Sequence, residues 1–222
     1  MAHTREAHRG YGRLIAGAVV AWSLAAASPA LAGWPEKTVT VVVPYAAGGN
    51  TDIMARLATD WLSSRLGARF IVENRVGAGA TLGTAYVAQA KPDGYTFLFG
   101  AAPQLLVAPL VQKVSYDARK DFAPVAIFGT GPQVLGINAG IPATNLKEFV
   151  AYAKAHPGRI NYASGGQGTA GHLTGALLAA RAGLDMVHVP YKGGAPATTD
   201  LLAGQVQMYF GNASELLPHA AS

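Results

Sequence analysis

The stretch TVTVVVPYAAGGNTDIMARLATDWLSSRLG, residues 38–67, decides the expected fold. It begins with a β-branched apolar run, which predicts a buried strand. The loop PYAAGGNTD at residues 44–52 follows, and residues 52–66 predict a helix that stops at Gly67. One face of this helix carries the apolar residues Ile53, Leu57, Trp61 and Leu62. The order of strand, glycine loop and helix indicates an α/β fold with a parallel sheet.

The same alternation continues along the chain, with a section of looser pattern at residues 103–124. Further strands are expected at residues 68–74, 95–101, 125–139, 159–163, 186–191 and 205–211. Further helices are expected at residues 81–90, 145–156, 172–183 and 196–203. Because the alternation restarts after the looser section, we expect two α/β lobes. We place lobe 1 at residues 33–125 and lobe 2 at residues 126–222.

The first 32 residues have the pattern of a secretory signal peptide. Three arginines precede an apolar stretch at residues 14–27, and the ALA at residues 30–32 is a small-x-small cleavage signal. We therefore expect cleavage after Ala32 and an exported mature protein. An uncleaved membrane anchor is the alternative, but the apolar stretch is shorter than the roughly 20 residues that a span needs.

Composition and missing motifs argue against several classes of function. The chain has 222 residues and a net charge of +5, and the charges are scattered singly, so we expect no nucleic-acid partner. It has no cysteine, which excludes a disulfide scaffold, a thiolate metal site and a cysteine nucleophile. It contains no G-x-S-x-G, P-loop or H-E-x-x-H motif, so we expect no metal, no cofactor and no catalysis.

Two glycine loops are candidate anion sites. Gly48 and Gly49 precede one expected helix, and SGGQGTAG at residues 164–171 precedes another. A helix start offers N–H groups without internal partners, together with the positive end of the helix dipole. Ligands of open α/β sheets lie at the carboxyl ends of the strands, where both loops are expected. The two loops together are therefore expected to bind an anionic ligand.

The same residues have structural alternatives. Asn50 or Thr51 would cap the helix that follows, with Asp52 in its first turn. A carboxylate that faced the site would repel an anion, so we expect Asp52 to orient backbone N–H groups or to bind water. His172, at the start of a helix, is more often solvated or hydrogen-bonded than catalytic.

The main enzyme alternative is an exported α/β oxidoreductase. Residues 166–171 match the dinucleotide pattern G-x-G-x-x-G, which is weak in a chain with 27 glycines. The pattern requires an acidic residue at the end of the next strand, and MVHVPY runs instead into Lys192. We therefore disfavour a nucleotide site.

Several blocks in order are more specific than any glycine motif. They are WPEKTVTVVVPYAAGGNTDIMAR, IVENRVGAGATLGTAYVAQAKPDGYTFLFG, YDARKDFAPVA, NYASGGQGTAGHLTGALL and VHVPYKGGAPATTDLLAGQVQMYFGN. From Trp34 to Pro218 the chain resembles the Bug (Bordetella uptake gene) family, the substrate-binding proteins of tripartite tricarboxylate transporters. The resemblance implies a periplasmic-binding-protein-like (type II) fold, a small carboxylate ligand, and delivery to the membrane components of a transporter.

The resemblance also implies a set of contacts in the loops Tyr45–Asp52 and Ser164–His172 and in the segment Ala101–Gln104. The expected ligand-binding residues are Tyr45, Ala47, Gly48, Gly49, Asn50, Thr51, Asp52, Ala102, Gln104, Ser164, Gly165, Gly168, Thr169, His172 and Asn212. Members of the family continue beyond the point that corresponds to Ser222. We therefore expect a C-terminally truncated chain with lobe 1 incomplete, and a remnant that binds nothing is a third hypothesis.

Overall fold

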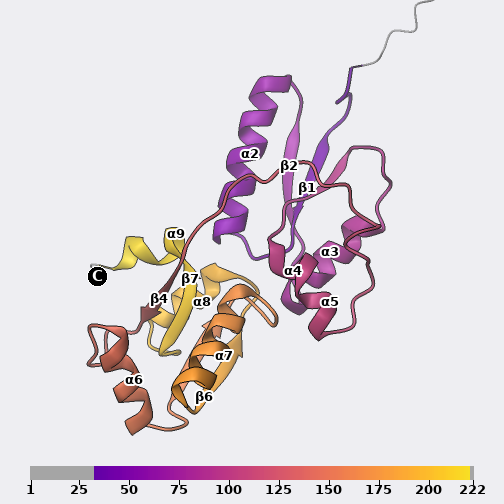
Figure 1. The fold of residues 1–222 in the computed structure, drawn as a ribbon. Helices are drawn as coiled ribbons and strands as arrows, with labels where there is room; N and C mark the ends of the chain where they lie inside the picture. Colours follow the sequence, from indigo (N-terminus) through magenta and orange to yellow (C-terminus); the bar gives the residue numbers. More distant parts are fainter. Residues whose placement is uncertain (1–32, 221–222) are drawn as a thin grey trace, which may run out of the picture. The chain divides into compact units, whose positions relative to one another are not determined.

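The computed structural model describes residues 33–220. The expected signal peptide, residues 1–32, and its cleavage site after Ala32 lie outside the described residues. One compact unit begins at Lys37 and contains two β-sheets. Strands from the earlier part of the chain form a three-stranded sheet, and strands from the later part form a four-stranded sheet (Figure 1).

The first sheet has the order β2-β1-β3 and is parallel throughout. Its strands are β1 (Val39–Val43), β2 (Phe70–Asn74) and β3 (Thr96–Leu98). Three valines of β1 are fully buried, because β1 is the central strand and its branched side chains pack into the core. The helices of this part are α2 (Asn50–Leu66) and α3 (Thr81–Ala88), with the short η1 (Ala78–Ala80) before α3.

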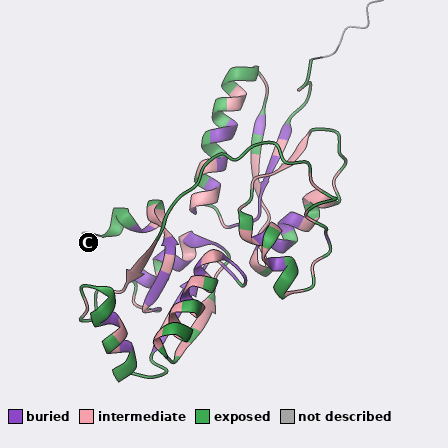
Figure 2. Cartoon of the chain, viewed as in Figure 1, coloured by how far each residue is buried: buried purple, intermediate pink, exposed green. Residues whose placement is uncertain are grey.

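Helix α2 is confirmed, but of the four large apolar residues expected on one face, Leu62 alone packs against the core. Ile53, Leu57 and Trp61 are about half exposed, at 47%, 57% and 63%. The buried positions are Asp52, Ala55, Ala58 and Thr59. Figure 2 shows buried and exposed stretches alternating along α2. Small residues face the sheet because α2 packs closely against β1 and β2, and a small side chain allows that approach.

The second sheet has the order β4-β7-β5-β6. Its strands are β4 (Gln133–Ile137), β5 (Ile160–Ser164), β6 (Met186–Pro190) and β7 (Met208–Asn212). β5 pairs in parallel with β6 and β7, and β4 pairs antiparallel with β7. The expected parallel-rich α/β architecture is therefore confirmed.

Helices cover both faces of the second sheet. They are α6 (Leu146–Ala155), α7 (Ala170–Ala182), α8 (Gly194–Leu202) and the one-turn α9 (Ala213–Leu216), followed by η2 (Leu217–His219). Tyr162 of β5 packs in one cluster with Phe149 of α6, and its neighbour Ala163 packs in another with Leu201 of α8. Successive strand residues point to opposite faces, so this division places α6 and α8 on opposite sides.

The long strand expected at residues 125–139 is wrong in its first half, because only residues 133–137 pair as a strand. Gly129, Gly131 and Pro132 interrupt the run, and proline cannot donate to a ladder. The segment before them is exposed, with Ile127 at 86%. The looser section also contains two short helices that the pattern did not predict, α4 (Ala102–Leu106) and α5 (Ala108–Val111).

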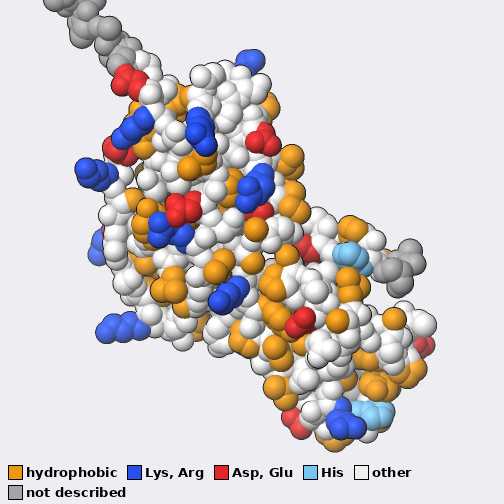
Figure 3. Space-filling view, turned by 180° about the vertical axis from the view of Figure 1, so that it is seen from behind, with side chains coloured by type: hydrophobic (Ala, Val, Ile, Leu, Met, Phe, Trp, Pro, Cys, Tyr) orange, Lys and Arg blue, Asp and Glu red, His pale blue; other side chains and the backbone are white. Residues whose placement is uncertain are grey.

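The surface of the described residues carries many apolar side chains. Figure 3 shows them interspersed with side chains of both charges on the face that it draws. None of the helices in residues 33–220 has the length and apolar character to cross a membrane. The two sheets are observed, but the lobe boundary at residue 125 stays a prediction.

Phe149 gives a direct test of the core of the second sheet, because its side chain is 1% exposed. Replacing Phe149 by Ala should lower the free energy of unfolding by about 3–5 kcal/mol, through lost burial and the cavity that remains. Chemical denaturation monitored by circular dichroism measures the change. Leu146→Ala on the same helix is the control, and at 52% exposure it should cost less than about 1 kcal/mol. Equal losses would contradict the assigned core.

Candidate functional site

A cavity of about 150 Å³ lies at the carboxyl ends of β1, β5 and β7. Several loops and helix starts from both sheets contribute to its wall. Its lining residues are Tyr45, Gly49, Asn50, Thr51, Ala101, Pro103, Gln133, Gly165, Thr169, Ala170, Gly171, Gly194, Tyr209, Phe210, Asn212 and Glu215. The starts of three helices, α2, α7 and α8, therefore meet at one cavity.

The start of α2 is formed by the first glycine loop. Gly48 has a positive φ of 82°, which a glycine adopts without strain. Gly49 is the N-cap, and no side chain caps the helix there. The expected capping by Asn50 or Thr51 is therefore wrong, because the helix begins at Asn50 and both residues lie inside its first turn. Both line the cavity instead.

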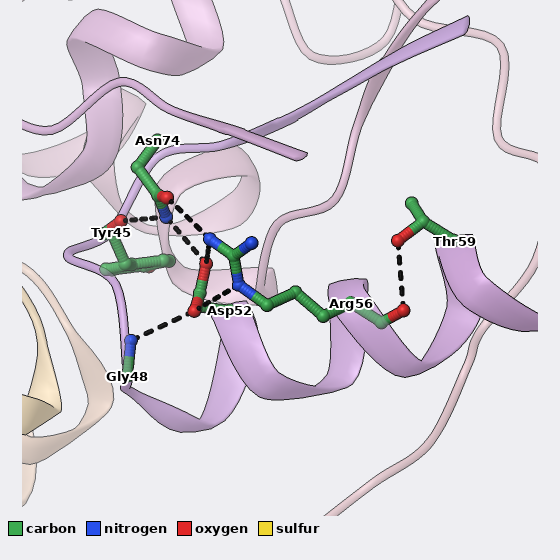
Figure 4. Close-up of polar contacts among 6 residues, drawn as sticks. All are labelled: Tyr45, Gly48, Asp52, Arg56, Thr59 and Asn74. Atoms are coloured by element: carbon green, nitrogen blue, oxygen red, sulfur yellow. Dashed lines mark hydrogen bonds and ion pairs between the residues drawn. The ribbon is translucent and has the colours of Figure 1, made fainter. Parts of the chain in front are cut away.

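Asp52 stabilises the first glycine loop through a network of hydrogen bonds (Figure 4). Its carboxylate accepts hydrogen bonds from the N–H of Gly48 at 2.9 Å, from Asn74 Nδ2 at 2.8 Å, and from Arg56 Nε and Nη2 at 2.9 and 3.0 Å. Burial by itself would raise the pKa of this carboxyl, but the hydrogen bonds from Arg56, Gly48 and Asn74 lower it below its usual value.

Asp52 is thus a positioning residue of the loop. Asn74 at the end of β2 also donates to the carbonyl of Tyr45, so one network joins the ends of two strands to the first turn of α2. The side chain of Asp52 is absent from the cavity wall. Its contact with the N–H of Gly48 is the arrangement expected of a residue that orients backbone groups.

The second glycine loop is held mainly by its own hydrogen bonds. Ser164 Oγ accepts from the N–H of Gly166 at 3.1 Å and lies 2.7 Å from His188 Nε2. Thr169 Oγ1 donates to the carbonyl of Gly166 at 2.7 Å. The N–H of Gly168 donates to His172 Nδ1 at 3.2 Å.

These contacts disfavour the dinucleotide alternative. A dinucleotide loop needs free backbone N–H groups to receive a pyrophosphate. The N–H groups of Gly166 and Gly168 already donate to Ser164 and His172. These two N–H groups are therefore not available to a phosphate in this conformation of the loop.

A stack of three rings lies beside this loop. The ring of His188 stacks on Tyr162 with centroids 5.0 Å apart and on His172 with centroids 4.1 Å apart. Burial, and then the neighbouring charge of His172, lower the pKa of His188 to about 4. Burial also lowers the pKa of His172. Burial therefore disfavours the charged form of both imidazoles.

The histidine pair predicts an acid-sensitive fold. The unfolded chain binds a proton at His188 near its usual pKa of 6.5, while the folded chain binds it only near pH 4. Protons therefore bind preferentially to the unfolded chain between these values, and the free energy of unfolding should fall as the pH drops from about 6.5 to 4. Denaturation at several pH values measures the slope.

The control for this prediction is a second histidine. His188→Gln removes the titrating group but keeps a polar partner for Ser164, so it should flatten the slope in this window. His156→Gln, at the exposed end of α6, is the control for the loss of a histidine elsewhere in the chain. An equal slope in the wild type and in His188→Gln would contradict the assignment.

The structure brings together some of the expected ligand-binding residues. The cavity is lined by Tyr45, Gly49, Asn50, Thr51, Gly165, Thr169 and Asn212. The others lie outside the cavity wall: Ala47, Gly48, Asp52, Ala102, Gln104, Ser164, Gly168 and His172. Gln104 is buried and accepts a hydrogen bond from the hydroxyl of Tyr45 at 2.9 Å, so it orients a lining residue.

Sequence reasoning missed five lining residues. They are Gln133, Gly194, Tyr209, Phe210 and Glu215. Gly194 had a signal, because the pair Gly193-Gly194 precedes an expected helix in the same way as the first loop. Glu215 had none, because its place depends on a contact between residues 165 positions apart.

Comparison with known proteins gives a consistent match. A family model described as "Tripartite tricarboxylate transporter family receptor" (TctC) matches residues 54–221. A protein of Pseudomonas sp. (strain P51), named "UPF0065 protein in tcbD-tcbE intergenic region", is 36% identical over 203 residues. The match covers 91% of this chain and 60% of that protein.

Two solved structures are similar in both sequence and fold. MatC (Rpa3494) from Rhodopseudomonas palustris, solved with bound malate, is 37% identical with a TM-score of 0.79. The match covers 83% of this chain and 63% of MatC. The periplasmic binding protein BugD is 36% identical with a TM-score of 0.72, over 85% of this chain and 63% of BugD. This chain therefore spans about three fifths of the length of the relatives that it matches.

Proposed function

The chain belongs to the tripartite tricarboxylate transporter receptor family, and on that premise we propose that it is a periplasmic solute-binding protein that captures a small carboxylate. The observation that carries the proposal is the convergence of the starts of α2, α7 and α8 on one cavity. Each helix start presents N–H donors and the positive end of a dipole, which favour an anion. The malate bound to MatC is a ligand of this chemical class.

The cavity itself supports binding rather than catalysis. Its lining residues include no lysine, arginine or histidine, so a ligand carboxylate would be held by backbone and neutral donors. A volume of about 150 Å³ suits a small solute, since an engineered cavity of about that size holds benzene. The buried Tyr45 and Tyr209 give the wall rigid surfaces, and burial raises the pKa of both phenols, so both stay neutral.

The rest of the assignment follows from the same premise. The N-terminal pattern supports export with cleavage after Ala32, and delivery would be to the membrane components of a tripartite tricarboxylate-type transporter. Ligand contact is assigned to the expected residues that line the cavity, with Asp52, Gln104, Ser164 and His172 as positioning residues. No catalytic step, metal or cofactor belongs to this mechanism.

Ligand binding can be tested by melting and calorimetry of the mature chain. Malate, as the first probe of a panel of small mono- and dicarboxylates, should raise the melting temperature and release or absorb heat with a saturable isotherm. Gly49→Val should weaken binding at least tenfold, because a side chain there would lie about 3.3 Å from Glu215 Oε1 and would narrow the cavity. NAD should give no shift.

The matched control is Gly131→Val, which adds the same side chain where nothing lies within 4 Å. It should bind as the wild type does. A cooperative melt without any response across the panel would reject carboxylate binding, and the absence of a cooperative melt would favour a remnant that binds nothing. A saturable response to NAD would favour the oxidoreductase.

A further inference from the structure

Glu215 carries the one charged side chain among the residues that line the cavity. Its carboxylate lies where the proposed ligand carboxylate is expected. Oε1 accepts a hydrogen bond from the N–H of Asn50, the first residue of α2, at 2.7 Å. Oε2 lies 3.2 Å from the hydroxyl of Tyr209 and 3.2 Å from the N–H of Asn212, both of which donate to it.

An ordinary helix cap explains only half of these contacts. Glu215 is the third residue of α9, and with Asn212 it forms a capping box. The capping box accounts for Oε2 and the N–H of Asn212. It does not account for Oε1, which accepts the hydrogen bond from the N–H of Asn50 at the start of α2. These two residues are 165 positions apart in the sequence. Ser214 Oγ supports the same approach, because it donates to Asn50 Oδ1 at 2.8 Å.

The start of α8 contributes to the same position. A Cβ placed on Gly194, the first residue of α8, would overlap Glu215 Oε1. Only the absence of a side chain at Gly194 lets the carboxylate come this close. The carboxylate of Glu215 therefore lies at the starts of α2 and α8, where both helix dipoles favour a negative charge.

We propose that the carboxylate of Glu215 is an internal occupant of the anion position at the start of α2, and that a ligand carboxylate binds there by replacing it. This inference rests on the proposed function and names the residue that sets its affinity. Two carboxylates cannot share the N–H of Asn50, and their like charges repel each other at such short range. Displacement of Glu215 therefore opposes binding, and more strongly for a ligand with two negative charges.

The inference predicts tighter binding when Glu215 is removed. Glu215→Ala empties the position, and Glu215→Gln keeps the shape and the capping acceptor while it removes the charge. Calorimetry should give at least tenfold tighter binding of malate to both variants, with a smaller gain for a monocarboxylate such as acetate. Asp60→Asn is the control, because it removes the same charge from an exposed site on α2. It should bind as the wild type does.

A second measurement keeps the inference testable if malate is not a ligand. The backbone amide signal of Asn50, followed by NMR, should move in a saturable way when acetate is added to Glu215→Ala. At equal acetate the signal should move less in the wild type, because Glu215 competes for the N–H of Asn50. Thermal melts of each variant establish that it is folded, and Glu215→Gln replaces Glu215→Ala in the titration if the alanine variant does not fold.

The outcomes separate the two proposals. An Asn50 response to acetate in the variant, with no binding of any panel member to the wild type, supports the internal occupant and rejects the proposed solutes. Binding of malate to the wild type with equal or weaker binding to both Glu215 variants overturns the internal occupant and leaves the proposed function intact. An Asn50 signal that does not respond in any folded variant also overturns it.

Discussion

Parallel strand pairing is the constraint on which the site depends. In a parallel sheet, every strand ends at the same edge, so the loops that follow β1 and β5 have to lie at the carboxyl edges of their sheets. Each loop then turns into a helix whose first N–H groups point back towards that edge. The cavity is the place where the starts of α2, α7 and α8 meet, and its chemistry is that of helix starts.

The many glycines of the chain serve close packing as well as the cavity. A Cβ on Gly83 of α3 would overlap the carbonyl of Arg75, and a Cβ on Gly171 of α7 would overlap the carbonyl of Phe210. These helices lie so close to neighbouring backbone that no side chain fits between them. Gly171 also lines the cavity. The absence of a side chain at this position therefore serves both the packing of α7 and the shape of the site.

Two carboxylates at the start of α2 have different roles. Asp52 is buried and is paired with Arg56, and it fixes the loop behind the cavity. Glu215 comes from the far end of the chain and faces the cavity, where no basic side chain lines the wall. A paired carboxylate stabilises the loop, whereas a carboxylate held by N–H and O–H donors alone can exchange with another anion that uses the same donors.

The sequence by itself determined the order of strands and helices, the two glycine loops and the family. These features depend on local periodicity, on turn residues and on ordered blocks of motifs, which a chain carries in any conformation. Local pattern failed at α2, where Ala55 and Ala58 rather than Leu57 and Trp61 face the sheet, because close packing favoured small residues.

Only the tertiary structure decided which residues of the loops line the cavity and what occupies the start of α2. Tyr45 and Thr169 come to one wall from different sheets, and Glu215 meets Asn50 across 165 positions of sequence. Such contacts depend on how the strands align and on the direction in which each side chain points. A single sequence records the residues that make these contacts but not the three-dimensional arrangement that brings them together.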